Sequence, residues 1–101
     1  MIEIKRIETE SGDIYKFIIG KDECISIYAD TDSVITKDEH YHRMIDNALC
    51  SSKYEDIDFE KFLLQYWLRS EYHIGNITLK EWRKYRTYLS KKYIERVIMD
   101  E

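Results

Sequence analysis

The sequence of 101 residues contains no proline and only three glycines. Flexible linkers and low-complexity tails are rich in such residues, so we expect neither. The two cysteines, Cys24 and Cys50, lack the spacing of a disulfide framework, which favours reduced thiols in a cytoplasmic protein. No apolar run approaches the roughly 20 residues that cross a bilayer, and residues 1–6 alternate isoleucine with charge. We therefore expect neither a membrane span nor a signal peptide.

Charged and aromatic residues, by contrast, are abundant. Charged residues make up 36% of the chain and aromatic residues 14%, with nine tyrosines. This composition is typical of a folded chain, and we expect one domain spanning residues 1–101. The net charge of −4 is unevenly distributed, because residues 76–101 hold seven basic and four acidic side chains. The remainder of the chain is therefore acidic, and an acidic body attracts basic surfaces and repels phosphate backbones.

Residues 1–35 have the pattern of an antiparallel β-meander. Apolar and polar residues alternate at the start of 2–9, β-branched and aromatic residues fill 14–19, and 24–29 alternates again. Short turns separate these segments, which is typical of strands that pair with their sequence neighbours. Residues 34–35 fit either a short fourth strand or a lead-in to a helix. We expect three to four strands in this part of the chain.

Residues 36–101 are expected to form three helices that cover one face of the sheet, so the predicted fold class is α+β. Thr36 with Glu39, and Thr78 with Glu81, have the spacing of a capping box at a helix start. Gly75 predicts the end of the second helix. The apolar spacing predicts these inward stripes: Tyr41, Met44, Ile45, Ala48 and Leu49 in the first helix; Phe59, Phe62, Leu63 and Tyr66 in the second; and Leu79, Trp82, Leu89, Tyr93 and Val97 in the third.

No pattern for catalysis or metal binding is present in the sequence. His40 and His42 are two residues apart, which on a helix turns them about 200° away from each other, so they cannot easily share a metal ion. Neither cysteine belongs to a recognisable Cys/His/Asp order, and three scattered glycines form no phosphate-binding loop. We therefore predict a non-enzymatic protein with no catalytic residue, no metal site and no cofactor.

The acidic and aromatic residues predict a surface for a protein partner. A domain this small cannot bury both faces of every element, and tyrosine and tryptophan dominate interface hot spots. Tyr72 lies opposite the predicted inward stripe of its helix, together with Leu68. The expected partner-binding residues are Glu55, Asp56, Asp58, Glu60, Tyr15, Tyr28 and Tyr72. We expect a basic protein as the partner, such as a nuclease or a guide-RNA complex, and self-association into a homodimer is an alternative.

The last helix provides a second, alternative function. Seven basic residues between 80 and 96 are interleaved with three tyrosines, and basic plus aromatic side chains are the usual means of contacting phosphates and stacking on bases. The chain could on this interpretation be a nucleic-acid-binding accessory domain that uses residues 79–99, with RNA as one ligand. The residues expected to make the contacts are Lys80, Lys84, Lys91 and Tyr88.

In overall character the chain is short, acidic and free of catalytic motifs. In these respects it resembles small inhibitors from phages and mobile elements, including anti-CRISPR proteins. The resemblance implies a non-enzymatic inhibitor that occupies the nucleic-acid-binding surface of a basic protein, such as a CRISPR effector nuclease. It extends over the whole chain and assigns a role to no individual residue.

Overall fold

The computed structural model describes residues 2–8, 14–21, 25–30 and 36–99. An antiparallel sheet with the strand order β1-β2-β3 is followed by helices, as the α+β prediction required. The elements are β1 (Ile2–Glu8), β2 (Ile14–Ile19), β3 (Ile25–Asp30), α1 (Lys37–Ser51), the 3-10 turn η1 (Tyr54–Asp56), α2 (Ile57–His73) and α3 (Leu79–Met99). Residues 34–35, considered above as a further strand, lie outside the described part of the chain.

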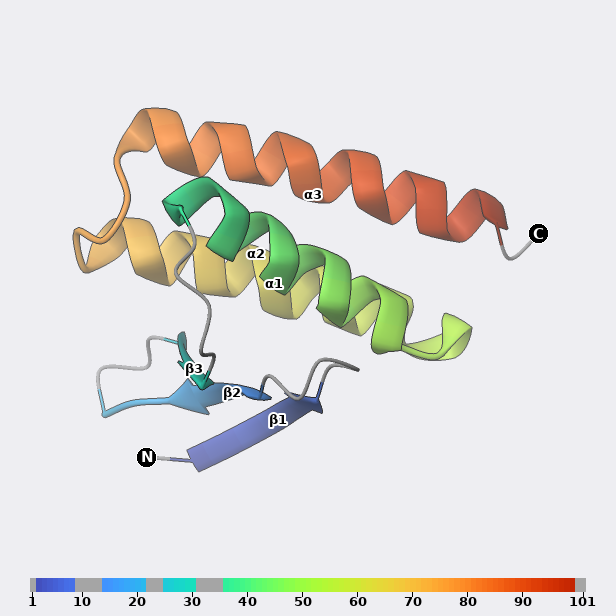
Figure 1. Ribbon diagram of the computed structural model, residues 1–101, viewed down its shortest axis with the longest axis horizontal. Helices are drawn as coiled ribbons and strands as arrows, with labels where there is room; N and C mark the ends of the chain where they lie inside the picture. The colour runs from blue at the N-terminus through green and yellow to red at the C-terminus, as the bar shows by residue number, and fades with distance from the viewer. Residues whose placement is uncertain (1, 9–13, 22–24, 31–35, 100–101) are drawn as a thin grey trace.

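The elements form three layers (Figure 1). α1 and α2 lie between the sheet and α3, with α2 contacting β3 on one side and α3 on the other. Phe17 of β2 is fully buried against this middle layer. Lys5 is its register partner on β1, so both side chains belong to the inner face of the sheet. A register shift between Glu3 and Lys5 places Lys5 on that face.

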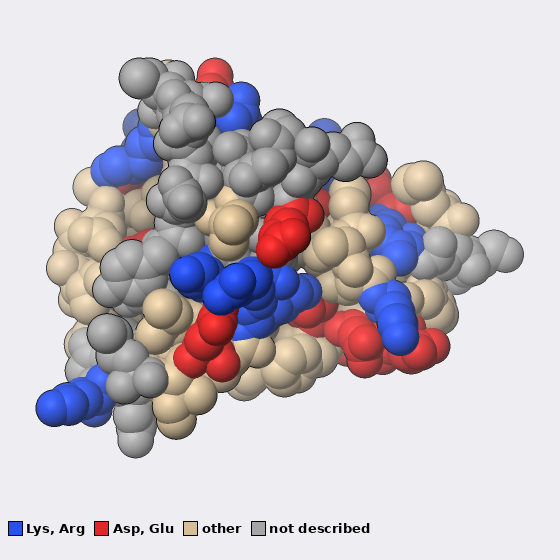
Figure 2. Space-filling model, turned by 60° about the horizontal axis from the view of Figure 1, so that its bottom comes forward, with Lys and Arg blue, Asp and Glu red and all other residues tan. Residues whose placement is uncertain are grey.

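The outer face of the sheet has mixed charge. Arg6 pairs in register with Lys16, and Glu3 pairs with Ile18, all on the face opposite Phe17. Arg6 also forms an ion pair with Glu3, with 3.1 Å between Nε and Oε1. Figure 2 shows Lys and Arg side chains gathered near the middle of this side of the molecule, with acidic side chains beside them. The described residues of this face are therefore not predominantly acidic, although the chain before residue 76 is acidic on balance.

The helices begin and end largely where the capping residues predicted. The Thr36 hydroxyl accepts the Glu39 N–H at 3.2 Å. At α3 both capping-box bonds form, because the Glu81 carboxylate accepts the Thr78 N–H and the Thr78 hydroxyl accepts the Glu81 N–H. Gly75, with φ of 87°, occupies the left-handed region just after α2. The second helix begins at Ile57, because η1 leads directly into it.

The core confirms the predicted stripe of α1 and corrects that of α2. Every residue predicted to face inward from α1 is buried. On α2, however, Phe59 and Phe62 are 62% and 60% exposed, whereas Leu64 and Leu68 are fully buried. The reason is that α2 is the middle helix and buries two sides, against α3 and against the sheet. Of the predicted α2 stripe only Leu63 is fully inside, and Tyr66 packs at its border.

Stacked aromatic rings connect all three helices within the core. Tyr41 of α1 stacks on Trp67 of α2 with ring centroids 5.0 Å apart, and on Tyr85 of α3 with centroids 4.6 Å apart. Phe17 of the sheet lies 6.3 Å from Trp67. Trp82, predicted to be part of the core, is instead half-buried at its edge. Several of the abundant aromatic residues are therefore used inside the domain.

Candidate functional site

The tyrosines of α3 bind carboxylates on the other two helices. The Tyr85 hydroxyl donates to Asp38 at 2.6 Å, and the Tyr88 hydroxyl donates to both oxygens of Asp46 at 2.9 Å. The Tyr93 hydroxyl likewise donates to Asp58. We call these three contacts the tyrosine–carboxylate bonds. They show that three of the nine tyrosines and three of the twenty acidic residues, which together suggested a docking surface, join α3 to α1 and α2.

These bonds change the ionisation of the groups that form them. Burial, followed by the bond to Asp46, raises the pKa of Tyr88 to about 12. Burial, followed by the bond to Asp38, also raises the pKa of Tyr85 well above its ordinary value. The Lys84 ammonium, followed by the Tyr85 hydroxyl, lowers the pKa of Asp38. Each shift favours the protonation state that holds the contact together at neutral pH.

The residues predicted to contact nucleic acid from α3 are only partly available. Tyr88 stacks on His42 with centroids 4.0 Å apart and is bonded through its hydroxyl, so stacking of this ring on a base does not fit the structure. Lys84 forms an ion pair with Asp38. Lys80 and Lys91 are exposed and make no ion pair within the described part of the chain.

Glu60, predicted to lie on the partner surface, is buried, which corrects that prediction. Only 7% of its side chain is exposed, and it forms an ion pair with Lys5 of β1. Lys5 also reaches the Ser52 hydroxyl at 3.5 Å. The second carboxylate oxygen of Glu60 has no hydrogen-bond partner among the described residues. The role visible for Glu60 is to join the sheet to α2.

Tyrosines from the predicted surface differ in what they contact. Tyr72 is 38% exposed, but one side of its ring stacks on Trp82 with centroids 4.9 Å apart. Tyr15 and Tyr28 belong to β2 and β3, and their side chains lie outside what the structure describes. Asp58 is exposed and bonded to Tyr93. Of the predicted set, Glu55 and Asp56 remain exposed without an ion pair to any described residue.

An acidic–aromatic patch forms around η1 and the first turn of α2. We define this patch by Tyr54, Glu55, Asp56 and Phe59. Tyr54 is 50% exposed and Phe59 is 62% exposed. Glu55 and Asp56 end η1, and Phe59 follows in the first turn of α2, so the two acids directly precede this turn in the chain. The sequence identified Glu55 and Asp56 but wrongly placed Phe59 in the core. The prediction assumed that α2 buries a single side, whereas this helix buries two.

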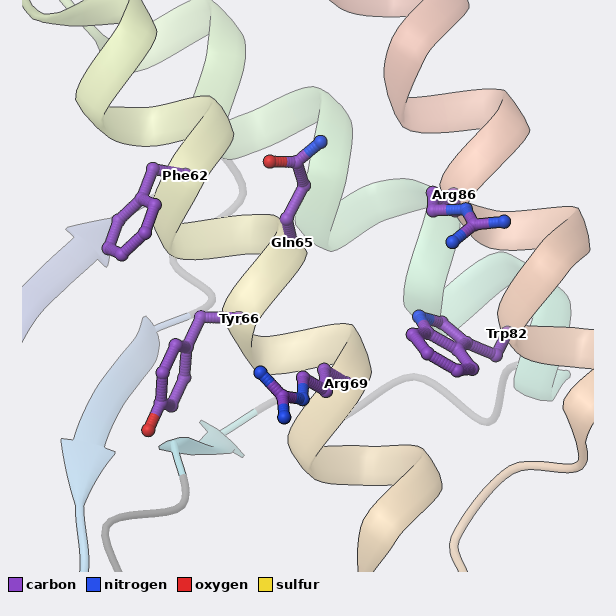
Figure 3. A pocket seen from close by; sticks show the side chains of 6 residues that line it. All are labelled: Phe62, Gln65, Tyr66, Arg69, Trp82 and Arg86. Atoms are coloured by element: carbon purple, nitrogen blue, oxygen red, sulfur yellow. The ribbon is translucent and has the colours of Figure 1, made fainter.

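A groove between α2 and α3 is the second candidate site (Figure 3). It encloses about 280 Å³ and is lined by Phe62, Gln65, Tyr66 and Arg69 of α2 together with Trp82 and Arg86 of α3. Neither arginine forms an ion pair with a described residue, and none of the described side chains that line the groove is acidic. The Arg86 guanidinium lies over the Trp82 ring, 5.4 Å from its centroid. We call this site the arginine groove.

The arginine groove was missed because its two cations belong to different helices. Arg86 was counted among the basic residues of the last helix, but Arg69 stands alone in an acidic region of the sequence. Only the packing of α2 against α3 brings the two elements together. Phe62 could have been recognised as exposed only if the buried sides of α2 had been predicted correctly.

The histidines do not assemble a metal site. Within the described ranges, no group of three His, Cys, Asp or Glu side chains could hold a metal ion. His40 is half-buried with its ring 5.3 Å from that of Tyr41, and burial lowers the pKa of His40. Among the described residues, no helix combines the length and apolar character required to cross a membrane.

Comparisons with protein-family models, with curated proteins and with solved structures found no match to this chain.

Proposed function

We propose that the chain is a non-enzymatic protein-interaction module that docks its acidic–aromatic patch onto a basic protein. The partner surface would carry lysine or arginine side chains around an apolar pocket that receives Phe59. A nucleic-acid-handling protein has such basic surfaces, because it must neutralise phosphates. Occupying that surface would make the chain an inhibitor of its partner.

The exposure of Phe59 is the observation that carries this proposal. Full burial of a phenylalanine side chain contributes about 1.5–3 kcal/mol, and this ring remains 62% exposed in the chain alone. Tyr54 of the same patch is 50% exposed. Large apolar side chains that are grouped and rimmed by polar residues are typical of protein-binding surfaces.

The acids of the patch determine the kind of partner. Acidic residues at a helix start also stabilise the helix through its dipole, so Glu55 and Asp56 alone would say little. Here they flank exposed rings and lack an ion pair with any residue that the structure describes. Complementary charge would accelerate association with a basic surface and exclude acidic ones.

A first experiment identifies the partner by affinity capture from lysate treated with nuclease, followed by titration of the purified partner at several salt concentrations. Glu55→Lys with Asp56→Lys, and separately Phe59→Ser, are expected to weaken binding at least about tenfold. The matched controls are Glu8→Lys with Glu39→Lys for charge and Ile94→Ser for apolar surface, since all three residues are exposed elsewhere. Equal loss in the controls, or an acidic partner, would overturn the proposal.

A second experiment tests the class of partner that the resemblance to anti-CRISPR proteins suggests. A guide-loaded effector nuclease is assayed for DNA cleavage with increasing amounts of the chain. Inhibition that is lost in Phe59→Ser but retained in Ile94→Ser supports an inhibitor acting through the patch. A stable homodimer that buries Phe59, detected by light scattering, would instead assign the patch to self-association.

A further inference from the structure

The arginine groove has a charge opposite to that of the chain as a whole. The chain carries a net charge of −4, yet the described lining of this groove contains two guanidinium groups and no acidic side chain. Two other cations of the helical layers are neutralised, since Lys37 pairs with Glu81 and Lys84 pairs with Asp38. Arg69 and Arg86 have no such partner among the described residues. The electrostatic character of the groove therefore favours an anion from outside the molecule.

Aromatic side chains give the groove a second recognition element. Phe62 is 60% exposed and its ring lies 6.3 Å from that of Tyr66, on the same side of α2. Trp82 is covered by Tyr72 through stacking and lies beneath the Arg86 guanidinium, so its role is to hold that cation in place. Phe62 is thus the ring with exposed surface for stacking, and Gln65 provides an amide beside it.

We propose that the arginine groove binds single-stranded nucleic acid, with Arg69 and Arg86 on phosphates and Phe62 stacked on a base. Positively charged grooves that carry exposed aromatic side chains are the general means of binding single strands without sequence preference. The groove is open and small, which suits a strand that passes along it with about one nucleotide enclosed. An acidic peptide would satisfy the arginines but would have no planar group for Phe62.

This inference concerns a different surface from the acidic–aromatic patch and does not depend on the proposed function. Substitutions of Phe59, Glu55 and Asp56 test the patch. Substitutions of Arg69 and Arg86 test the groove. A partner protein that carries a guide or substrate strand could engage both surfaces together. The two proposals can therefore fail separately.

The test uses fluorescence anisotropy of a labelled oligouridine of about 12 nucleotides with the full chain, at about 50 to 200 mM salt. Arg69→Gln with Arg86→Gln should weaken binding at least about tenfold. It should also reduce the slope of log K against log salt by about 1.4, because each phosphate contact to a single strand contributes about 0.7. Phe62→Leu should weaken binding at least about fivefold, since stacking contributes at least about 1 kcal/mol per base.

Arg43→Gln with Lys53→Gln is the matched control, because it removes the same charge from exposed positions that do not line the groove. This control should change affinity less than about threefold. All variants are checked by circular dichroism, and the exposed arginines should tolerate glutamine. Three results would overturn the inference: no binding of the oligonucleotide at low salt, equal loss in the Arg43 and Lys53 control, or equally tight binding of an oligoglutamate peptide that competes for the groove.

Discussion

The buried ion pair between Lys5 and Glu60 allows a direct test of how the sheet is held to the helices. Replacing Lys5 with methionine preserves most of the side-chain length but leaves the Glu60 carboxylate without a cation. Removal of one partner from a buried pair costs about 3–5 kcal/mol. The Lys5 side chain is 20% exposed and that of Glu60 is 7% exposed, so water compensates little for the loss of the pair. We expect a loss near the lower end, about 3 kcal/mol.

The second half of this test replaces both residues. Lys5→Met with Glu60→Met removes the charges together, and such apolar replacement of a buried pair is often neutral or stabilising. The free energy of unfolding, measured by urea denaturation with circular dichroism, should therefore fall by about 3 kcal/mol in the single variant and largely recover in the double. For a domain of this size, the single loss corresponds to a melting temperature lower by roughly 12–24 °C.

Two results would refute this reasoning. If Lys5→Met alone lost less than about 1 kcal/mol, the pair would behave as an exposed one. If the double variant were as unstable as the sum of both single variants, the two side chains would act independently. Either result would remove the ion pair as the link between β1 and α2.

Four further predictions concern stability. Tyr88→Phe should cost about 1–2 kcal/mol by urea denaturation and leave the Asp46 carboxylate unbonded. The raised pKa of Tyr88 means that its contribution is complete below pH 10 and is lost as pH rises towards about 12, so the difference in free energy of unfolding between Tyr88→Phe and the unchanged chain should shrink over this range. Gly75→Ala should cost about 1 kcal/mol from φ of +87° alone, since nothing lies within 4 Å of an added Cβ; a neutral result would exclude the left-handed turn. His40 has a lowered pKa, so stability should fall as pH decreases below 6.5, where the unfolded chain binds the proton first, and His40→Gln should flatten that part of the curve. Phe59→Ser should change stability by less than about 0.5 kcal/mol, and a large loss would place this ring in the core.

The sequence predicted those parts of the fold that depend on nearby residues. The capping boxes at Thr36 and Thr78 and the stop at Gly75 are local hydrogen-bond and backbone effects. The α1 stripe was correct because this helix buries one principal side. The α2 stripe was wrong because a helix buried on two sides has no single apolar face, and the aromatic residues were given priority over Leu64 and Leu68.

The sites required contacts between residues distant in the sequence. Tyr88 and Asp46 are 42 positions apart, and Lys5 and Glu60 are 55 apart, so no spacing rule relates them. Glu60 therefore appeared to belong to a surface cluster with its neighbours Glu55 and Asp56. Glu55 and Asp56, which are exposed and form no ion pair with a described residue, could be selected only once the partners of Asp58 and Glu60 were known.

The tyrosine–carboxylate bonds also fix the rotation of α3 about its own axis. Their hydroxyls leave α3 at three successive levels, and a roll of the helix would withdraw all three from Asp38, Asp46 and Asp58 at once. The side of α3 that carries Trp82 and Arg86 is consequently oriented before any ligand arrives. A receptor already in its bound conformation loses little entropy on complex formation, so association at the groove should proceed in one kinetic phase without a slow rearrangement.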